Sequence, residues 1–345
     1  MVKPRRSKTT DFAKHIEYFL LKYLPYERNL SPATVKSYRD VLVQFIIFME
    51  KSKSVKANNL TLKQLNRANV QDFVSHMRDV GCKPSTCNHR LVVIWSLVKY
   101  LQFSEIQLMQ QWQQVLSINK MKEEEPSVGY LSVDAIGTLL ATPNRMTRSG
   151  RRHALILSLM YDLGARVQEI ADLKVSDIRL YDNEVTVHVK GKGNKGRVVP
   201  LMGESIDTIR QYLKEWGLAE PDKADHPLFF NARGSKLTRS GIAHILNTYV
   251  EICRREKPML FLESVSCHTL RHSKAMHLLQ AGVNLIYIRD LLGHSSVKTT
   301  EIYARVGSSF KNEALKKAYR GTTVETGITP MWLDNPDLLD KLRNL

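Results

Sequence analysis

Residues 268–303 read HTLRHSKAMHLLQAGVNLIYIRDLLGHSSVKTTEIY, and this stretch carries the densest set of chemically reactive side chains in the chain. The imidazoles, the guanidinium and the phenol in it are His268, Arg271, His272, His294 and Tyr303. Together these groups can bind a phosphodiester, move protons and attack phosphorus. The spacing of the apolar residues predicts helices over 268–281 and 284–293, and a third helix that begins near Ser296 and bears Tyr303.

The overall composition indicates which kind of phosphate-containing partner this segment would bind. The chain of 345 residues has a formal net charge of +17 and a pI near 9.7, which favours a polyanion, nucleic acid first, over a small acidic substrate. No apolar run of about 18 residues occurs, and the basic residues 1–8 do not lead into an apolar segment. We therefore expect a cytoplasmic protein associated with the nucleoid, with no membrane segment.

The four cysteines indicate a reducing compartment. Cys82, Cys87, Cys253 and Cys267 form neither a Cys-x-x-Cys pair nor a dense disulfide framework. Cys82 and Cys87 have the spacing of half a loose zinc site, but no second half follows nearby. We therefore predict no metal centre and assign these thiols no role.

The first part of the chain predicts a small helical bundle. Four amphipathic stripes occur before residue 118, and Pro32 stands at a first helical position, where its missing N–H costs little. Residues 119–129 are polar and aperiodic, as in an interdomain linker. The sequence thus predicts a helical domain over 1–118 and a linker over 119–129.

The second part is predicted to be mainly α-helical with a small β-hairpin, an α+β catalytic domain over 130–320. The alternating, β-branched residues 184–189 and the strand 197–201 flank the glycine-rich basic turn 190–196, which predicts the hairpin. Besides those named above, the predicted helices cover 132–142, 151–163, 166–173, 203–215, 238–256 and 311–319. Residues 321–345 are predicted to form a C-terminal tail with a final amphipathic piece.

Each reactive residue also has an ordinary structural interpretation. His268 and Arg271 could be a surface pair, His294 a cap residue, and Tyr303 core filler. The i, i+4 spacing of His268 and His272 could also indicate metal ligation. We discount a metal because no glutamate lies between the two histidines, and because fixed cations suffice for phosphate chemistry.

Taken together, the motifs resemble the tyrosine recombinase (phage integrase) family, in its Xer-like form. LGARVQEI at 163–170 resembles the first arginine motif of the family, and VKGKGNK at 189–195 resembles its β-hairpin turn. His268 and Arg271 match the His-x-x-Arg motif, His294 the later His or Trp position, and Tyr303 the nucleophile. The resemblance covers nearly the whole chain and implies a SAM-like core-binding bundle followed by a catalytic domain.

The resemblance implies a role for each matched residue. Arg166 and Arg271 would clamp the non-bridging oxygens, because a guanidinium donates two parallel hydrogen bonds to phosphate. Tyr303 would attack and form a 3′-phosphotyrosyl link, which conserves bond energy, so no cofactor, ATP or metal is expected. His268 is the favoured base and His294 would orient the phosphate or the phenol.

Two further roles depend on the same resemblance. Lys192 would be the general acid for the 5′ oxygen, although Lys190 and Lys195 are near enough in sequence to compete. Glu169, three residues after Arg166, would order that guanidinium.

The expected partner is double-stranded DNA with specific recombination sites, bound by a protein that is monomeric when free and a homotetramer on two sites. The tail could dock on a neighbouring protomer, as in similar recombinases, or fold back on its own domain. Candidate backbone contacts are Arg5, Arg6, Arg90, Arg151, Arg152, Lys190, Lys195 and Arg239.

The sequence therefore predicts a site-specific recombinase that acts through a Holliday junction, for integration, excision or transposition of a mobile element. Xer-type dimer resolution of a chromosome or plasmid remains an alternative, as does a type IB topoisomerase that relaxes DNA without a specific site. A DNA-binding regulator that has lost catalysis is disfavoured, since every catalytic position is filled.

Overall fold

The computed structural model describes residues 9–123, 129–182, 184–191, 196–294 and 296–306. The chain divides into two compact units, Met1–Pro126 and Ser127–Leu345. The predicted helix 311–319 and the tail 321–345 lie outside the described residues, as do Arg5, Arg6, Lys192 and Lys195.

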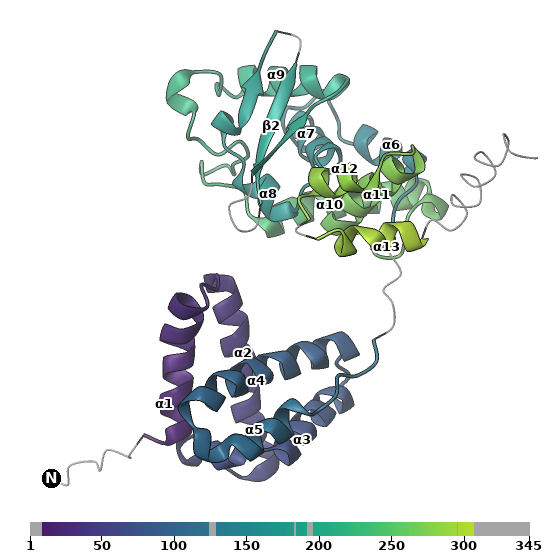
Figure 1. The fold of residues 1–345 in the computed structure, drawn as a ribbon. Coiled ribbons are helices and arrows are strands. Elements are labelled where there is room, and N and C mark those ends of the chain that lie inside the picture. Colours follow the sequence, from purple (N-terminus) through teal and green to yellow (C-terminus); the bar gives the residue numbers. More distant parts are fainter. Residues whose placement is uncertain (1–8, 124–128, 183, 192–195, 295, 307–345) are drawn as a thin grey trace, which may run out of the picture. The chain divides into compact units, whose positions relative to one another are not determined.

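The N-terminal unit is a bundle of helices, as the apolar stripes predict (Figure 1). Side-chain caps lie at the start of several helices: Thr10 accepts a hydrogen bond from Ala13 N, Ser31 from Thr34 N and Asn66 from Asn69 N. The helices are α1 (Asp11–Tyr18), the π-helix η1 (Phe19–Glu27), α2 (Pro32–Lys53), α3 (Arg67–Asp79), α4 (Pro84–Ser104) and α5 (Met109–Leu116), with short 3-10 turns at Ala57–Asn59, Leu62–Gln64 and Ile106–Leu108. Helix α5 is not among the four predicted ones.

Large aromatic side chains fill the core of this unit. Phe19, Phe45, Phe73 and Trp112 are fully buried, and the rings of Phe45 and Phe73 meet edge to face. Burial of side chains this large is the main favourable term for such a bundle. The N-terminal unit therefore has a hydrophobic core of its own.

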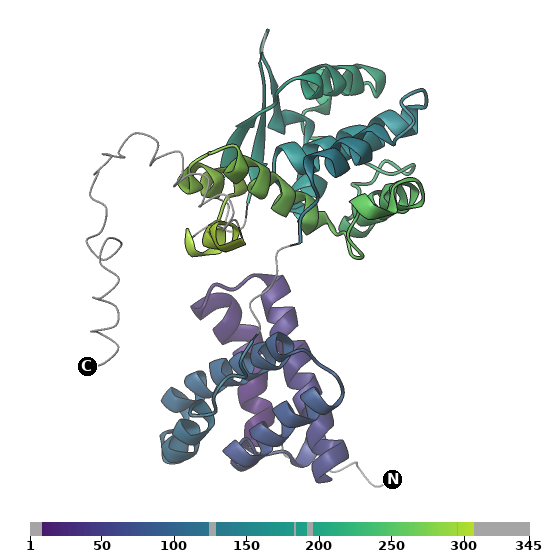
Figure 2. The ribbon, with the colours of Figure 1, turned by 90° about the vertical axis from the view of Figure 1, so that its right-hand side faces the viewer.

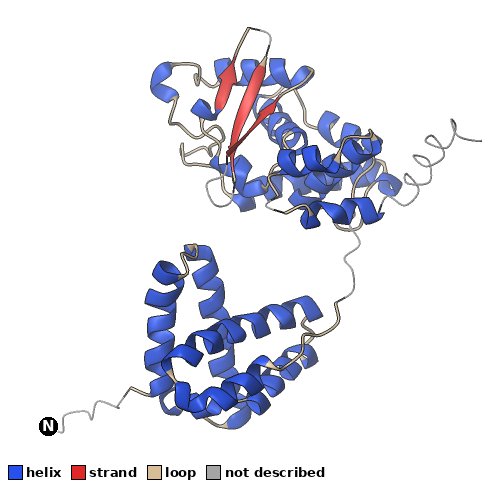
Figure 3. Cartoon of the chain, viewed as in Figure 1, coloured by secondary structure: helices blue, strands red, loops and turns tan. Residues whose placement is uncertain are grey.

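The C-terminal unit combines helices with one small sheet, which Figure 3 shows in red. Its helices are α6 (Val133–Ala141), α7 (Arg148–Asp162), α8 (Val167–Asp172), α9 (Glu204–Glu215), α10 (Arg239–Glu256), α11 (Cys267–Gln280), α12 (Leu285–Leu292) and α13 (Lys298–Val306). Short 3-10 turns lie at Val175–Asp177, Pro221–Lys223 and Pro258–Leu260.

The sheet has three antiparallel strands in the order β1 (Ile178–Leu180), β2 (Val185–Lys190) and β3 (Gly196–Pro200). The predicted hairpin is β2–β3, in which Lys190 pairs with Gly196 and Val187 with Val199. Strand β1 was not predicted. Val185, Val187 and Val189 are buried, so the apolar residues of β2 alternate toward the core.

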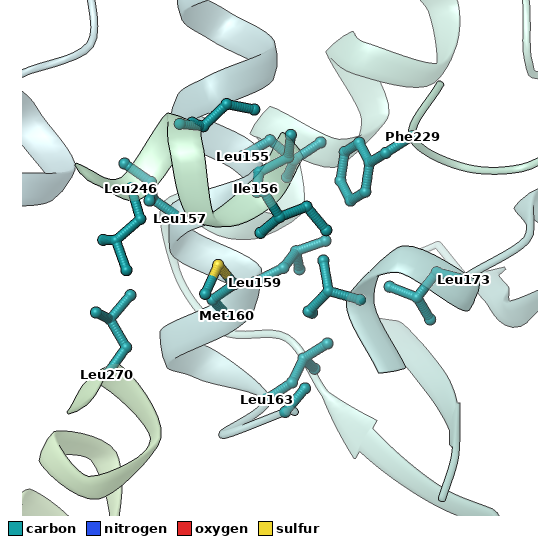
Figure 4. Close-up of a cluster of buried hydrophobic side chains, with 14 of the residues drawn as sticks. Leu155, Ile156, Leu157, Leu159, Met160, Leu163, Leu173, Phe229, Leu246 and Leu270 are labelled. Carbon is teal, nitrogen blue, oxygen red and sulfur yellow. The ribbon is translucent and has the colours of Figure 1, made fainter. Parts of the chain in front are cut away.

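Helix α7 forms the centre of the C-terminal core. Figure 4 shows its apolar side chains between Leu246 of α10, Leu270 of α11 and Phe229. The α7 residues labelled there are Leu155, Ile156, Leu157, Leu159 and Met160, all of which are buried. This packing holds the start of α8 and the start of α11 close together.

The last three described helices pack on one another (Figures 1 and 2). A small apolar cluster of Ala275, Met276, Ile288, Leu292 and Tyr303 joins them. Among the described residues, no helix combines the length and apolar character that crossing a membrane requires.

Candidate active site

Arg271 lies at the centre of the site and connects three segments. Its guanidinium donates Nη1–H to the carbonyl of Gly164 and Nη2–H to the carbonyl of Leu292, both at 2.6 Å. Gly164 follows α7 at φ 51°, and Leu292 ends α12 before Gly293, which adopts φ 62°. Burial, followed by the charge of Arg166, lowers the pKa of Arg271 to about 10, so the group stays charged at neutral pH.

Arg166 and Arg197 share the carboxylate of Glu169. Glu169 Oε1 accepts a hydrogen bond from Arg166 Nη1 at 2.7 Å, and Oε2 accepts one from Arg197 Nη2 at 2.8 Å. Burial alone would raise the pKa of Glu169, but hydrogen bonds and charges from Arg197 and Arg166 lower it overall. Among the described residues, this cluster sets three guanidiniums, counting Arg271, against one carboxylate, and thus favours an anion.

The contacts of Glu169 predict a stability effect. We expect Glu169→Gln to lower the free energy of unfolding by about 3 kcal/mol at pH 7, because it leaves Arg166 and the partly buried Arg197 without a counter-charge. The folded-state pKa lies below the ordinary 4.5, so the carboxylate's contribution is present above that pH and is lost as pH falls through the folded pKa. Urea unfolding at several pH values measures this.

The control variant is Glu215→Gln. Glu215 also lies between two arginines, 2.6 Å from Arg151 and 3.7 Å from Arg148, but it is more exposed than Glu169. We expect a smaller loss there. An equal loss in both variants at pH 7, or a Glu169 difference that does not shrink in acid, would contradict the ion-pair argument.

Tyr303 and His272 form the second part of the site. Tyr303, on α13, has 1% of its surface exposed, and its hydroxyl lies 2.8 Å from His272 Nδ1. Burial raises the pKa of Tyr303, whereas the charges of Arg271 and Arg166 lower it. Burial also lowers the pKa of His272, as do His268 and Arg271. The phenol thus lies in the field of the guanidiniums beside a neutral imidazole.

His268 and His294 complete the set of imidazoles. His268 is exposed, and its ring centroid is 6.2 Å from that of His272. His294 follows the Gly293 turn, and its Nδ1 lies 2.9 Å from the hydroxyl of buried Thr300. Burial, followed by Arg271 and Arg166, lowers the pKa of His294 to about 4, so it is neutral at pH 7.

The structure thus brings together Arg166, Glu169, His268, Arg271, His294 and Tyr303. The sequence motifs assign no role to His272, Arg197 or Thr300. The spacing of four from His268 was the signal for His272, interpreted there only as a metal possibility. Arg197 has no local signal, because its partner Glu169 is distant in sequence and only folding brings the two side chains together.

Four of the five predicted DNA contacts that the structure describes have partners within the protein. Arg90 donates to Gln44, Arg151 pairs with Glu215, and Arg152 donates to the carbonyl of Phe230 beside the ring of Trp216. Lys190 lies 3.3 Å from Asp177, while Arg239 is exposed at the start of α10. Arg151 and Arg152 would have to exchange these contacts to bind phosphate.

No group of three or more His, Cys, Asp or Glu side chains in the described residues is arranged to hold a metal ion. His268 and His272 are the pair whose spacing could have suggested a metal. His268 is exposed, and His272 contacts the hydroxyl of Tyr303.

Two family profiles and several known proteins match the chain. The profile of the "Phage integrase family" matches residues 130–309, and that of the "Phage integrase, N-terminal SAM-like domain" matches residues 16–103. The y4rC protein of Sinorhizobium fredii (strain NBRC 101917 / NGR234), named as an integrase/recombinase, is 32% identical over 341 residues, 98% of this chain and 100% of its own length.

Two further relatives extend the match. Tyrosine recombinase XerD of Listeria monocytogenes (serovar 1/2a, strain EGD-e) is 30% identical over 293 residues, 84% of this chain and 93% of its own length. A crystal structure of XerH site-specific recombinase, in a post-cleavage complex with palindromic difH substrate, shares the fold, with a TM-score of 0.65 over 90% of each chain at 22% identity. The chain therefore belongs to the phage integrase family, the tyrosine recombinases.

Proposed function

We propose that this chain is a site-specific DNA recombinase that cuts and rejoins strands through a 3′-phosphotyrosyl intermediate and a Holliday junction. The observation that carries the proposal is the position of the Tyr303 phenol, in the field of both Arg271 and Arg166. Those guanidiniums would neutralise the non-bridging oxygens of the scissile phosphate, while His294 and the exposed His268 orient it.

The reaction needs no external energy source in this scheme. Attack by Tyr303 exchanges one phosphodiester for another, and attack by a 5′-hydroxyl reverses it, so neither ATP nor a metal is consumed. Because the phenol is 1% exposed, the scissile phosphate can reach its oxygen only after some of the residues that cover it move.

A trapping experiment tests the activity. Sites are selected by binding from a random duplex library, and a nicked duplex of the selected sequence is incubated with the protein in EDTA without nucleotide. We expect a covalent complex on a denaturing gel, and binding that weakens steeply with salt. No complex, or one that requires Mg²⁺ or ATP, would contradict the proposal. Relaxation of plasmids lacking the site would indicate the topoisomerase alternative instead.

The biological role that we propose is integration, excision or transposition of a mobile element, in the cytoplasm on nucleoid DNA. Similarity to a protein named integrase/recombinase supports it, whereas similarity to a XerD protein favours dimer resolution as the second candidate. The genomic position of the selected site decides: the ends of an element support the first role, and a chromosomal or plasmid resolution site supports the second.

The assembly that acts on two such sites would be a homotetramer formed from free monomers. Tail residues 321–345 could link neighbouring protomers in it.

The general acid is proposed to be Lys192, two residues after Lys190 at the end of β2. We expect Lys192→Ala to slow cleavage of ordinary DNA by about 10²–10⁴-fold but to cleave a 5′-bridging phosphorothiolate at nearly the wild-type rate, because a thiolate leaves without a proton. Lys190→Ala is the control and should affect both substrates alike. Equal Lys192→Ala defects on both substrates would exclude Lys192 as the acid.

A further inference from the structure

The imidazole of His272 contacts the nucleophile directly. Its Nδ1 lies 2.8 Å from the Tyr303 hydroxyl, and the two rings are 5.7 Å apart at 57°. Tyr303 is enclosed by an apolar cluster that includes Met276, Ile288 and Leu292. The phenolic proton therefore has a short, direct path to an imidazole nitrogen inside a water-poor pocket.

The surroundings of His272 keep it able to accept that proton. The titratable and charged groups facing it are His268 and Arg271 on its own helix, Tyr303 on α13, and His294 in the α12–α13 turn. Burial, followed by His268 and Arg271, disfavours the imidazolium form. A neutral ring with its proton on Nε2 offers the Nδ1 lone pair to the phenol.

His268, the base favoured by sequence resemblance, has different surroundings. Its ring is exposed, and the charges of Arg271 and Arg166 act on it in addition to partial desolvation. These are the properties of a group that meets the incoming phosphate. In the HTLRH segment, His268 would thus contact the phosphate, whereas His272 contacts the nucleophile.

We propose that His272 is the catalytic residue that accepts the proton of Tyr303 during strand cleavage and returns it during strand joining; the assignment rests on the proposed function. In cleavage, a lone pair of Tyr303 Oη forms the P–O bond, the P–O5′ bond breaks, and the phenolic proton moves to His272 Nδ1. The 5′ oxygen takes its proton from a separate acid. In joining, the 5′-hydroxyl attacks phosphorus and returns its proton to that acid, and the leaving phenolate recovers the other proton from His272.

Three variants separate proton acceptance from positioning. His272→Ala removes both functions, whereas His272→Asn keeps an acceptor near the Nδ1 position but cannot take a proton. The control is His277→Ala, because His277 Nδ1 also lies 2.8 Å from a tyrosine hydroxyl, that of Tyr161 on α7. We expect both His272 variants to trap a nicked duplex of selected site about 10²–10⁴-fold more slowly than wild type. His277→Ala should trap at the wild-type rate per folded molecule.

Rescue of trapping by added imidazole distinguishes proton acceptance from a purely structural role. Imidazole should restore trapping in His272→Ala, with a pH dependence that follows its own titration, but not in His272→Asn, where the site is filled. Trapping by the Asn variant at the wild-type rate, or no rescue of the Ala variant, would overturn the proposal.

A measurement on the free protein is independent of DNA. Nitrogen-15 NMR of histidine-labelled wild type should show His272 with an unprotonated Nδ1 at pH 7, identified by its loss in His272→Asn. A protonated Nδ1 would overturn the assignment while the recombinase function stands. Failure of wild type to trap any selected duplex would overturn the proposed function itself, and this assignment with it.

Discussion

Tyr303→Phe should bind the selected duplex with wild-type affinity and form no covalent complex, a loss of more than about 10⁴-fold in trapping. The change removes one oxygen, the atom that lies 2.8 Å from His272. The ring keeps its place among Ala275, Met276 and the other apolar side chains, because phenylalanine has nearly the same shape. Trapping on denaturing gels and binding by fluorescence anisotropy measure the two properties separately.

The matched control is Tyr161→Phe. Tyr161 also makes a 2.8 Å contact with a histidine of α11, His277, so this variant loses the same kind of hydrogen bond away from the guanidiniums. We expect comparable small losses of stability, about 1 kcal/mol each, and full trapping by the control. Covalent complex formed by Tyr303→Phe would contradict the assignment of the nucleophile.

Much of the candidate active site could be predicted, because its residues lie in short motifs with local structure. Arg166 begins α8 shortly after a glycine with positive φ, Arg271 lies near the start of α11, and His294 follows the glycine that ends α12. Periodicity locates such helix ends well. The β2–β3 hairpin was equally clear from its alternating residues, whereas β1 has only three residues and too short a pattern to detect.

The remaining parts depend on contacts between distant segments. The Arg197 side chain on β3 reaches the Glu169 carboxylate on α8, and the sequence near Arg197 does not encode that approach. Arg151 shows a second limit of the sequence. In sequence it is one of a basic group that suits DNA, but folding brings Glu215 to within 2.6 Å and gives its charge a partner. Residue type predicts the charge but does not predict its partner.

Arg271→Lys should lower both stability and activity, although it keeps the positive charge. Lysine keeps the charge, but a single ammonium cannot reach the carbonyls of both Gly164 and Leu292, which the guanidinium joins at 2.6 Å each. One buried carbonyl left without a donor costs about 1–3 kcal/mol, and the free energy of unfolding should fall by that amount. Urea unfolding measures this loss.

Activity should fall further than stability explains, because the same two bonds fix the relative positions of the α7–α8 link, α11 and the turn carrying His294. We expect trapping per folded molecule to fall by about 10²–10³-fold, the usual cost of losing one oriented donor to a transition-state anion. Arg254→Lys is the control, since Arg254 also donates to two backbone carbonyls, those of Leu262 and Glu263, but is partly exposed. It should lose less stability and keep full trapping. Normal trapping by folded Arg271→Lys would contradict this argument. Charge alone would then suffice at this position, and the hydrogen bonds that link Arg271 to the turn carrying His294 would have no role in catalysis.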